Sequence, residues 1–300
     1  MGGRNQPRSR ISKKPFIRQV WASNFISQIT QFDECLRFHT ILTIDTEFLG
    51  FIIQSPRDSI DEEIYKNFHF NVNQMKLIQL GITASNDLGQ IGGSWEFNFS
   101  DFDFQVDAHS PSAIPFLEKN GLDFKKLKKD GIPIASFTKK FLPIIKKRDI
   151  FRWVTFHGLY DIGYLIKAMG LITMLPKSME EFATLVVNEV GIVRDLKHMA
   201  RFCEVLEDGR LGLERLGKIL NKKRFGMKHN AGSDSLLTSS AHFEMVKRFG
   251  MTYEVCNGFL YGFSESLESM KMKMKIYHQN ILRLGQIPHF PYTPSCIISH

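Results

Sequence analysis

The chain has 300 residues, of which 43% are hydrophobic and 23% charged, and its formal net charge at pH 7 is +8. This apolar fraction is ordinary for a globular protein and permits a full hydrophobic core in one large domain or two small ones. The positive charge is compatible with a polyanionic partner such as nucleic acid. No apolar run is long enough to span a bilayer, and no apolar signal segment follows Met1, so no membrane association is expected. The four cysteines lack the paired spacing of a disulfide framework or a metal knuckle, which favours a soluble protein of a reducing compartment; they are Cys35, Cys203, Cys256 and Cys296.

Basic residues gather in three places along the chain. Residues 1–15 are basic and rich in Gly, Ser, Asn and Pro, which predicts a disordered arm. This arm could be a simple tail, a nucleic-acid contact or an import signal. The lysines of 125–129 and the basic residues of 139–148 are better explained as solvated helix faces.

Hydrophobic periodicity predicts an alternation of helices and short strands. A helix over 19–32 precedes a β-branched strand over 40–48, and an irregular segment with a short helix follows over 51–73. Further strands are expected at 77–83, 94–99, 152–157 and 191–195, and further helices at 111–120, 136–148, 161–169, 179–188, 196–203, 211–220 and 232–249. Residues 253–282 are expected to be helix plus irregular chain, and residues 284–300 a loose tail. This order predicts a single α/β domain with a mixed sheet flanked by helices.

Four acidic residues have contexts that together indicate a two-metal nuclease. Asp45 and Glu47 share one face of a strand, because strand side chains repeat every two residues. Asp161 begins a helix after the strand 152–157, and Asp234 lies in the first turn of the long late helix. Several hard oxygen ligands of this kind can hold two Mg²⁺ or Mn²⁺ ions at a scissile phosphate. His229, five residues before Asp234, is placed to remove a proton from water, because histidine exchanges protons near neutral pH.

Each of these residues alone has a simpler explanation. An acid pair on a strand is common at protein surfaces, and Asp161 could be a helix cap. Asp234 could be an acid favoured by the helix dipole, and His229 an ordinary loop histidine. The three local contexts in this order, with the histidine at this offset, favour the joint site.

Several segments around these residues resemble the DEDD exonuclease superfamily, in its histidine variant. Within that superfamily they resemble the CCR-associated-factor (CAF) deadenylases, the catalytic partners of the large NOT scaffold. The resemblance spans about residues 16–263, and its most specific segment is Ala-Gly-Ser-Asp-Ser-Leu-Leu-Thr at 231–238. The other segments are 20–24, 45–48, 77–81, 95–99, 156–165 and 257–262.

The resemblance implies an RNase H-like fold over 16–263 and 3′→5′ removal of poly(A) from mRNA with release of AMP. It maps the metal ligands onto Asp45, Glu47, Asp161 and Asp234, and the base onto His229. It also implies two divalent cations, a NOT scaffold subunit and a second deadenylase subunit as partners. It favours the cytoplasm and leaves the nucleus open. Residues 264–300 then form a C-terminal extension, partly disordered.

Contacts to single-stranded poly(A) RNA are expected from Phe48 and Leu49, which follow the acid pair, and from His157 and Tyr160, which precede Asp161. Phe48 could equally be a core residue. The chain departs from the family pattern at Leu49, Leu159, Ile162 and Asn230, which are expected at the rim of the site and not among its ligands. Two other readings stay open: a general 3′→5′ exonuclease on other single-stranded nucleic acid, and a scaffold subunit with secondary activity.

Overall fold

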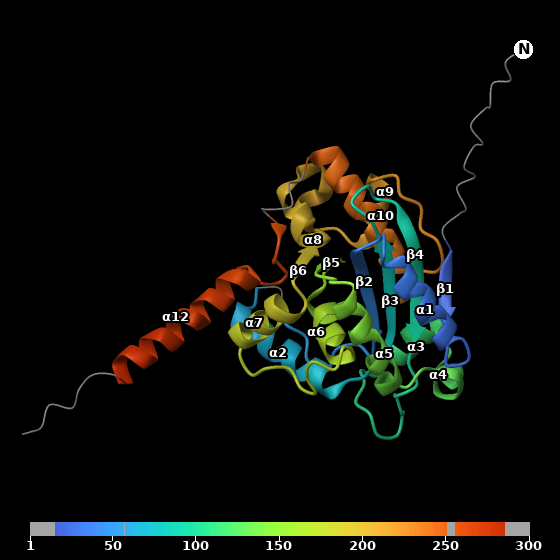
Figure 1. Cartoon of the computed structure of the whole chain (residues 1–300), viewed down its shortest axis with the longest axis horizontal. Helices are drawn as coiled ribbons and strands as arrows, with labels where there is room; N and C mark the ends of the chain where they lie inside the picture. The colour runs from blue at the N-terminus through green and yellow to red at the C-terminus, as the bar shows by residue number, and fades with distance from the viewer. Residues whose placement is uncertain (1–15, 57, 251–255, 286–300) are drawn as a thin grey trace, which may run out of the picture.

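A single mixed β-sheet organises the chain (Figure 1). The computed structural model describes residues 16–56, 58–250 and 256–285. The six strands lie in the order β1-β4-β3-β2-β5-β6. The pairs β4–β3 and β3–β2 are antiparallel, whereas β1–β4, β2–β5 and β5–β6 are parallel. The strands are β1 (Ile17–Val20), β2 (Ile41–Phe48), β3 (Leu77–Ser85), β4 (Ile91–Asn98), β5 (Arg152–Thr155) and β6 (Ile192–Asp195).

Helices cover both faces of this sheet, as the sequence predicts for an α/β domain. The longest helix on the sheet, α10, packs against β2 and β3. The α-helices are α1 (Phe25–Cys35), α2 (Asp61–Gln74), α3 (Ala113–Lys119), α4 (Phe124–Asp130), α5 (Ile134–Lys147), α6 (Leu159–Ala168), α7 (Met179–Glu189), α8 (Leu196–Met199), α9 (Leu213–Ile219), α10 (Ala231–Phe249) and α12 (Leu267–Gly285). Two 3₁₀ segments, Ala200–Phe202 and Glu204–Gly209, follow α8.

The two faces of the sheet differ in chemistry because side chains alternate along each strand. One face carries large apolar side chains such as Leu42, Ile82 and Trp95, which join a buried cluster with α1, α5 and α6. The other face carries small and polar side chains, and α10 meets it with hydroxyls. Thr83 Oγ1 lies 3.1 Å from the Oγ of Ser235. The polar face therefore carries the kinds of side chain from which an active site is made.

Residues 17–20 form a strand, so the predicted helix over 19–32 is wrong at its start. The strand β1 runs parallel to β4, and α1 begins only at Phe25. Asn24 separates the two elements, because its side-chain oxygen accepts the N–H of Trp21 at 2.9 Å and its amide donates to the carbonyl of Gln19 at 3.0 Å. The short helix expected within 51–73 is the 14-residue α2, with three acids in its first turn that favour it through the helix dipole.

The last described helix, α12, packs against α7 and projects away from the sheet (Figure 1). It lies in the predicted C-terminal extension. The predicted basic arm and the end of the tail fall outside the described residues. Within the residues that the structure describes, no helix is both long and apolar enough to cross a membrane.

Candidate active site

Three carboxylates meet on the polar face of the sheet. One oxygen each from Asp45, Glu47 and Asp234 lies within 4.8 Å of the other two. Asp45 and Glu47 extend from the same face of β2, and Asp234 comes from the first turn of α10. The structure therefore brings together three of the four acids that the sequence singles out.

The fourth acid, Asp161, is tied to the same strand. It lies in the first turn of α6 and is buried. Its Oδ1 accepts a hydrogen bond of 2.6 Å from the hydroxyl of Thr46, the residue between Asp45 and Glu47. Its carboxylate is not among the three that lie within 4.8 Å of one another. Burial raises the pKa of Asp161 to about 7, against the opposing effect of the Thr46 hydrogen bond.

The cluster is short of positive charge. Burial raises the pKa of both Asp45 and Glu47 well above the usual range of carboxyls, and the nearby carboxylates of Asp234 and Asp161 raise it further. Close carboxylates cannot all ionise unless a cation compensates them. An all-oxygen donor set suits Mg²⁺ or Mn²⁺, since these ions prefer carboxylate ligands. The residues present therefore fit the divalent cations expected from the sequence.

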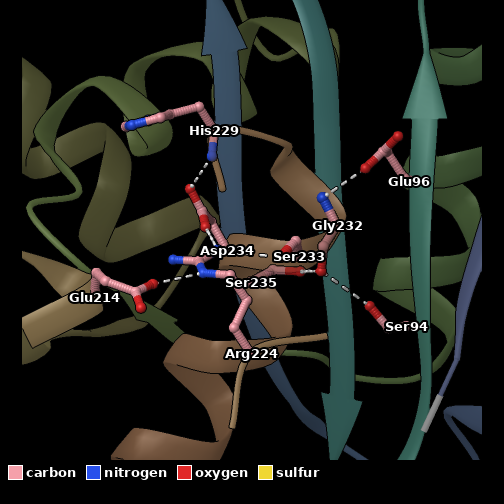
Figure 2. A network of polar contacts seen from close by, with 9 residues as sticks. All are labelled: Ser94, Glu96, Glu214, Arg224, His229, Gly232, Ser233, Asp234 and Ser235. Atoms are coloured by element: carbon pink, nitrogen blue, oxygen red, sulfur yellow. Dashed lines mark hydrogen bonds and ion pairs between the residues drawn. The ribbon is translucent and has the colours of Figure 1, made fainter. Parts of the chain in front are cut away.

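Among the described residues, Arg224 brings a positive charge to Asp234 (Figure 2). Its guanidinium pairs with the Asp234 carboxylate, donates to the Ser233 hydroxyl at 3.0 Å and donates to Glu214 at 2.9 Å. Burial raises the pKa of Asp234, and the Arg224 guanidinium partly offsets that rise. Arg224 thus fixes the direction of the Asp234 carboxylate and is itself fixed by Glu214.

The start of α10 rests directly on the backbone of β3. Gly81 faces Asp45 across the β2–β3 pair, and a Cβ atom at Gly81 would lie 1.9 Å from the carbonyl oxygen of Ala231. Glu96, on β4, accepts the N–H of Gly232 at 3.0 Å and the side-chain amide of Asn230 at 3.2 Å. These contacts bring Asp234 to the strand that carries Asp45. Asn230, one of the departures from the family pattern, therefore has a partner in the structure.

His229 reaches this cluster with its backbone and not with its ring. Its N–H lies 3.3 Å from Asp234 Oδ2, and its φ of 56° is left-handed. The imidazole extends away from Asp234 in Figure 2 and packs edge-on against Phe116, with ring centroids 4.8 Å apart. A role as base requires this ring to turn toward the carboxylates.

The residues expected to contact substrate are placed differently from one another. Phe48 is half-buried, stacked on Tyr160 with ring centroids 5.2 Å apart, and it also touches Tyr164. Leu49 is fully buried in a separate apolar cluster with Met75 and Ile78. Its side chain therefore offers no surface to a ligand.

His157 occupies an exposed turn between β5 and α6, with a left-handed φ of 64°. Asp195, at the end of β6, accepts the backbone N–H groups of His157 and Gly158 at 2.8 and 2.9 Å. It also accepts those of Lys197 and Tyr261, both at 2.9 Å. This fully buried carboxylate therefore fixes the turn from which Asp161 emerges.

Comparison with known proteins places the chain in a family. The profile described as "CAF1 family ribonuclease" matches residues 20–150. The Arabidopsis thaliana protein named CCR4-associated factor 1 homolog 8 is 42% identical over 218 residues, which cover 72% of this chain and 90% of that protein. The chain belongs to the CAF1 family of ribonucleases. The poly(A) ribonuclease pop2 of Schizosaccharomyces pombe, another family relative, is 33% identical over 241 residues, covering 78% of this chain and 70% of that protein.

Solved structures of CAF1 relatives share the fold. A structure of S. pombe Pop2p in a Mg²⁺- and Mn²⁺-bound form matches with a TM-score of 0.73 and 32% identity, covering 82% of this chain and 99% of that one. A yeast CAF1 co-crystallised with the NOT1 MIF4G domain matches with a TM-score of 0.67 and 23% identity, covering 82% of this chain and 96% of that one. At that identity the second match shows the fold alone. The expected mixed sheet flanked by helices is confirmed.

Three residues of this CAF1-family site were not anticipated from the sequence. Arg224 lies between the predicted helices 211–220 and 232–249, in a segment to which the sequence assigns no role, and Glu96 is one polar position of the predicted strand 94–99. Asp195 reads as the end of a strand before a helix, where an acid is a common cap. Each is an ionisable side chain that is buried or mostly buried, which is the signal that a structure adds to a sequence.

Proposed function

We propose that this chain is a 3′→5′ poly(A)-specific exoribonuclease that releases AMP. The observation that carries the proposal is the convergence of carboxylate oxygens from Asp45, Glu47 and Asp234 within 4.8 Å in a chain of the CAF1 family. Two relatives support it. The S. pombe relative is named a poly(A) ribonuclease, and its matching structure holds Mg²⁺ and Mn²⁺.

Asp45, Glu47, Asp161 and Asp234 would hold two divalent cations. When bound, such ions activate a water nucleophile and stabilise the leaving oxygen of a phosphodiester. The protein contributes ligands on rigid elements, two from a central strand and one each from the first turns of two helices. Arg224 keeps the Asp234 carboxylate in place, and Thr46 does the same for Asp161.

His229 would accept the proton of the attacking water. Its backbone N–H already adjoins Asp234, so rotation of the side chain away from Phe116 brings the ring toward the site. General bases contribute about 10²- to 10⁴-fold. We therefore expect His229→Ala to lower kcat within that range. An unchanged kcat would show that another group takes the proton.

Single-stranded RNA would run across the partly open surface formed by Phe48, Tyr160 and His157. Phe48 directly follows the ligand Glu47 in the chain, Tyr160 directly precedes the ligand Asp161, and the two rings stack on each other. Leu49, in contrast, supports the fold from inside the core.

The decisive experiment uses 5′-labelled RNA ending in a poly(A) tract, with Mg²⁺ or Mn²⁺ present. We expect a ladder that shortens from the 3′ end and stops at the body of the RNA, and we expect Asp45→Ala or excess EDTA to abolish it. A control RNA with a different 3′ tail should survive longer. Equal degradation of every tail would indicate a general exonuclease, and full activity in excess chelator would refute the two-metal mechanism.

The name of its relatives, CCR4-associated factor, supports assembly with the CCR–NOT complex. The yeast structure named above contains a CAF1 bound to the NOT1 MIF4G domain. We propose that this chain likewise binds a NOT scaffold subunit and works beside a second deadenylase subunit, chiefly in the cytoplasm. Co-elution of purified chain and scaffold domain in size-exclusion chromatography tests the first contact, and separate elution at micromolar concentration would contradict it.

A further inference from the structure

The ring of His229 lies against α3 in this structure and not against the carboxylates. Its centroid is 4.8 Å from that of Phe116, with the two ring planes at 62°. The ring extends away from Asp234 in Figure 2, while the backbone N–H of His229 lies 3.3 Å from Asp234 Oδ2. The main chain of His229 is therefore already at the site, so the direction of its side chain decides whether the imidazole faces the carboxylates.

The loop that carries His229 is held from two sides. Gly121, just after α3, has a left-handed φ of 93°, and a Cβ atom there would lie 3.2 Å from the Sδ of Met227. On the other side, Arg224 pairs with Asp234 in the first turn of α10. His229 itself contacts both sides, because its ring meets Phe116 and its N–H meets Asp234. The loop backbone is thus fixed at the place where the ring has two possible neighbours.

The contact between the two rings is of a strength that a protein can reverse. Phe116 is 46% exposed, and His229 is exposed as well, so no packed core encloses either ring. An edge-on aromatic pair favours one arrangement over another by roughly 2- to 10-fold in population. Exposed side chains also change rotamer quickly compared with enzyme turnover. Phe116 therefore biases the direction of the imidazole without locking it.

We propose that Phe116 is a positioning residue that holds the imidazole of His229 in a resting direction, so that the base faces the attacking water in only a fraction of the molecules. This rests on the proposed function, because it takes His229 as the base. Removal of the Phe116 ring then raises that fraction. The contact concerns the base and not the binding of RNA, so the gain belongs to kcat and leaves KM unchanged.

Steady-state kinetics on an oligoadenylate with saturating Mg²⁺ test the effect on the reaction. We expect Phe116→Ala to raise kcat roughly 2- to 10-fold at an unchanged KM, because it removes the edge-on contact. Phe116→Tyr keeps an aromatic ring and should give the wild-type kcat. In a His229→Ala background, Phe116→Ala should give no gain, because the base whose direction it changes is absent.

Phe104→Ala is the matched control for loss of an exposed ring. Phe104 is 48% exposed and stands edge-on to Phe102, with ring centroids 4.9 Å apart. Its replacement therefore deletes an aromatic pair of the same kind and exposure. The kcat of this variant should equal that of the wild type, and both alanine variants should keep the wild-type Tm.

NMR observes the contact itself, without any reaction. A nuclear Overhauser effect between the ring protons of Phe116 and His229 is expected in the free wild-type protein. It should weaken when Mg²⁺ and a hydrolysis-resistant phosphorothioate oligoadenylate are added, because the imidazole then turns toward the attacking water.

The outcomes are distinct. A kcat that is unchanged or lower in Phe116→Ala would overturn the proposal, and so would an equal gain in the His229→Ala background. Absence of the Overhauser effect in the free protein would overturn it as well. A wild-type protein that shortens no oligoadenylate would instead overturn the proposed function, and the Overhauser measurement would still decide whether Phe116 holds the ring.

Discussion

Two buried aspartates follow neighbouring parallel strands and have opposite surroundings: Asp195 is the last residue of β6, and Asp161 lies in the first turn of α6, the helix after β5. Asp195 accepts four backbone N–H groups at 2.8 to 2.9 Å. The donors are in the turn at 157–158, at Lys197 and at Tyr261. Asp161 accepts the Thr46 hydroxyl and faces other carboxylates. The protein supplies hydrogen-bond donors to the carboxylate of Asp195. The carboxylate of Asp161 instead needs a cation to compensate its charge. A buried acid of the first kind holds structure, and one of the second kind marks where chemistry takes place.

The largest effect on stability is expected from removing the hydrogen-bonded carboxylate of Asp195. Asp195→Ala removes the acceptor of four backbone N–H groups, one buried and three partly buried, so we expect it to lower the free energy of unfolding by about 3–5 kcal/mol. Asp195→Asn, which keeps one carbonyl oxygen, should lose less. Urea unfolding measures both. A loss below about 1 kcal/mol for the alanine variant would mean that other groups fix the turn at His157.

The second prediction concerns how stability changes with pH through the carboxyl group of Asp161. In the metal-free protein the folded-state pKa of Asp161 is about 7, above its unfolded value, so the folded state holds more protons between these two pKa values. Stability in EDTA should therefore fall as pH rises from about 4 to about 7, by at most about 1.4 kcal/mol per pH unit from this group. In Asp161→Asn this component should disappear while activity is lost. A pH dependence identical in both proteins would assign it to other groups.

Binding of a divalent cation should offset the loss of stability that ionisation of Asp161 causes in EDTA. Mg²⁺ or Mn²⁺ at about 100 times its Kd should stabilise the wild type by about 2.7 kcal/mol, seen as a rise in Tm. Asp45→Ala should show little of this rise, because one ligand is gone. Asp195→Asn, whose change lies outside the cluster, should still respond to the cation. Equal responses in wild type and Asp45→Ala would place the bound ion elsewhere.

The smallest effect is expected on metal affinity, from removing Arg224, the partner of the Asp234 carboxylate. Removing an outer partner of a ligand typically weakens metal binding by about 10-fold or more. We expect about this loss for Arg224→Gln in Mn²⁺ calorimetry. Arg215→Gln, which removes an exposed arginine paired with Glu207, is the control and should bind normally. Tighter binding by Arg224→Gln would show that Arg224 competes with the ion and does not position its ligand.

Local sequence patterns predicted much of this site. The remaining features depend on contacts between segments that are distant in the chain. Asp45 and Glu47 could be placed on one strand face because a strand repeats every two residues. Asp195 could not be recognised as a support, since three of its partners come from segments 37, 38 and 66 residues away. The ring direction of His229 depends on Phe116, in a separate helix. The strand β1 was missed because four residues bordering a helical apolar pattern offer too short an alternation.

The seating of α10 on Gly81 has a consequence for the choice of ion. The approach of Ala231 to Gly81 is backbone against backbone, so the gap between the β2 carboxylates and Asp234 cannot widen unless the helix lifts from the sheet. Mg²⁺ binds oxygen at about 2.0–2.1 Å and Ca²⁺ at about 2.3–2.6 Å. If the gap is held fixed in this way, we expect the site to favour Mg²⁺ over Ca²⁺, and we expect that preference to depend on Gly81, which touches no ion itself.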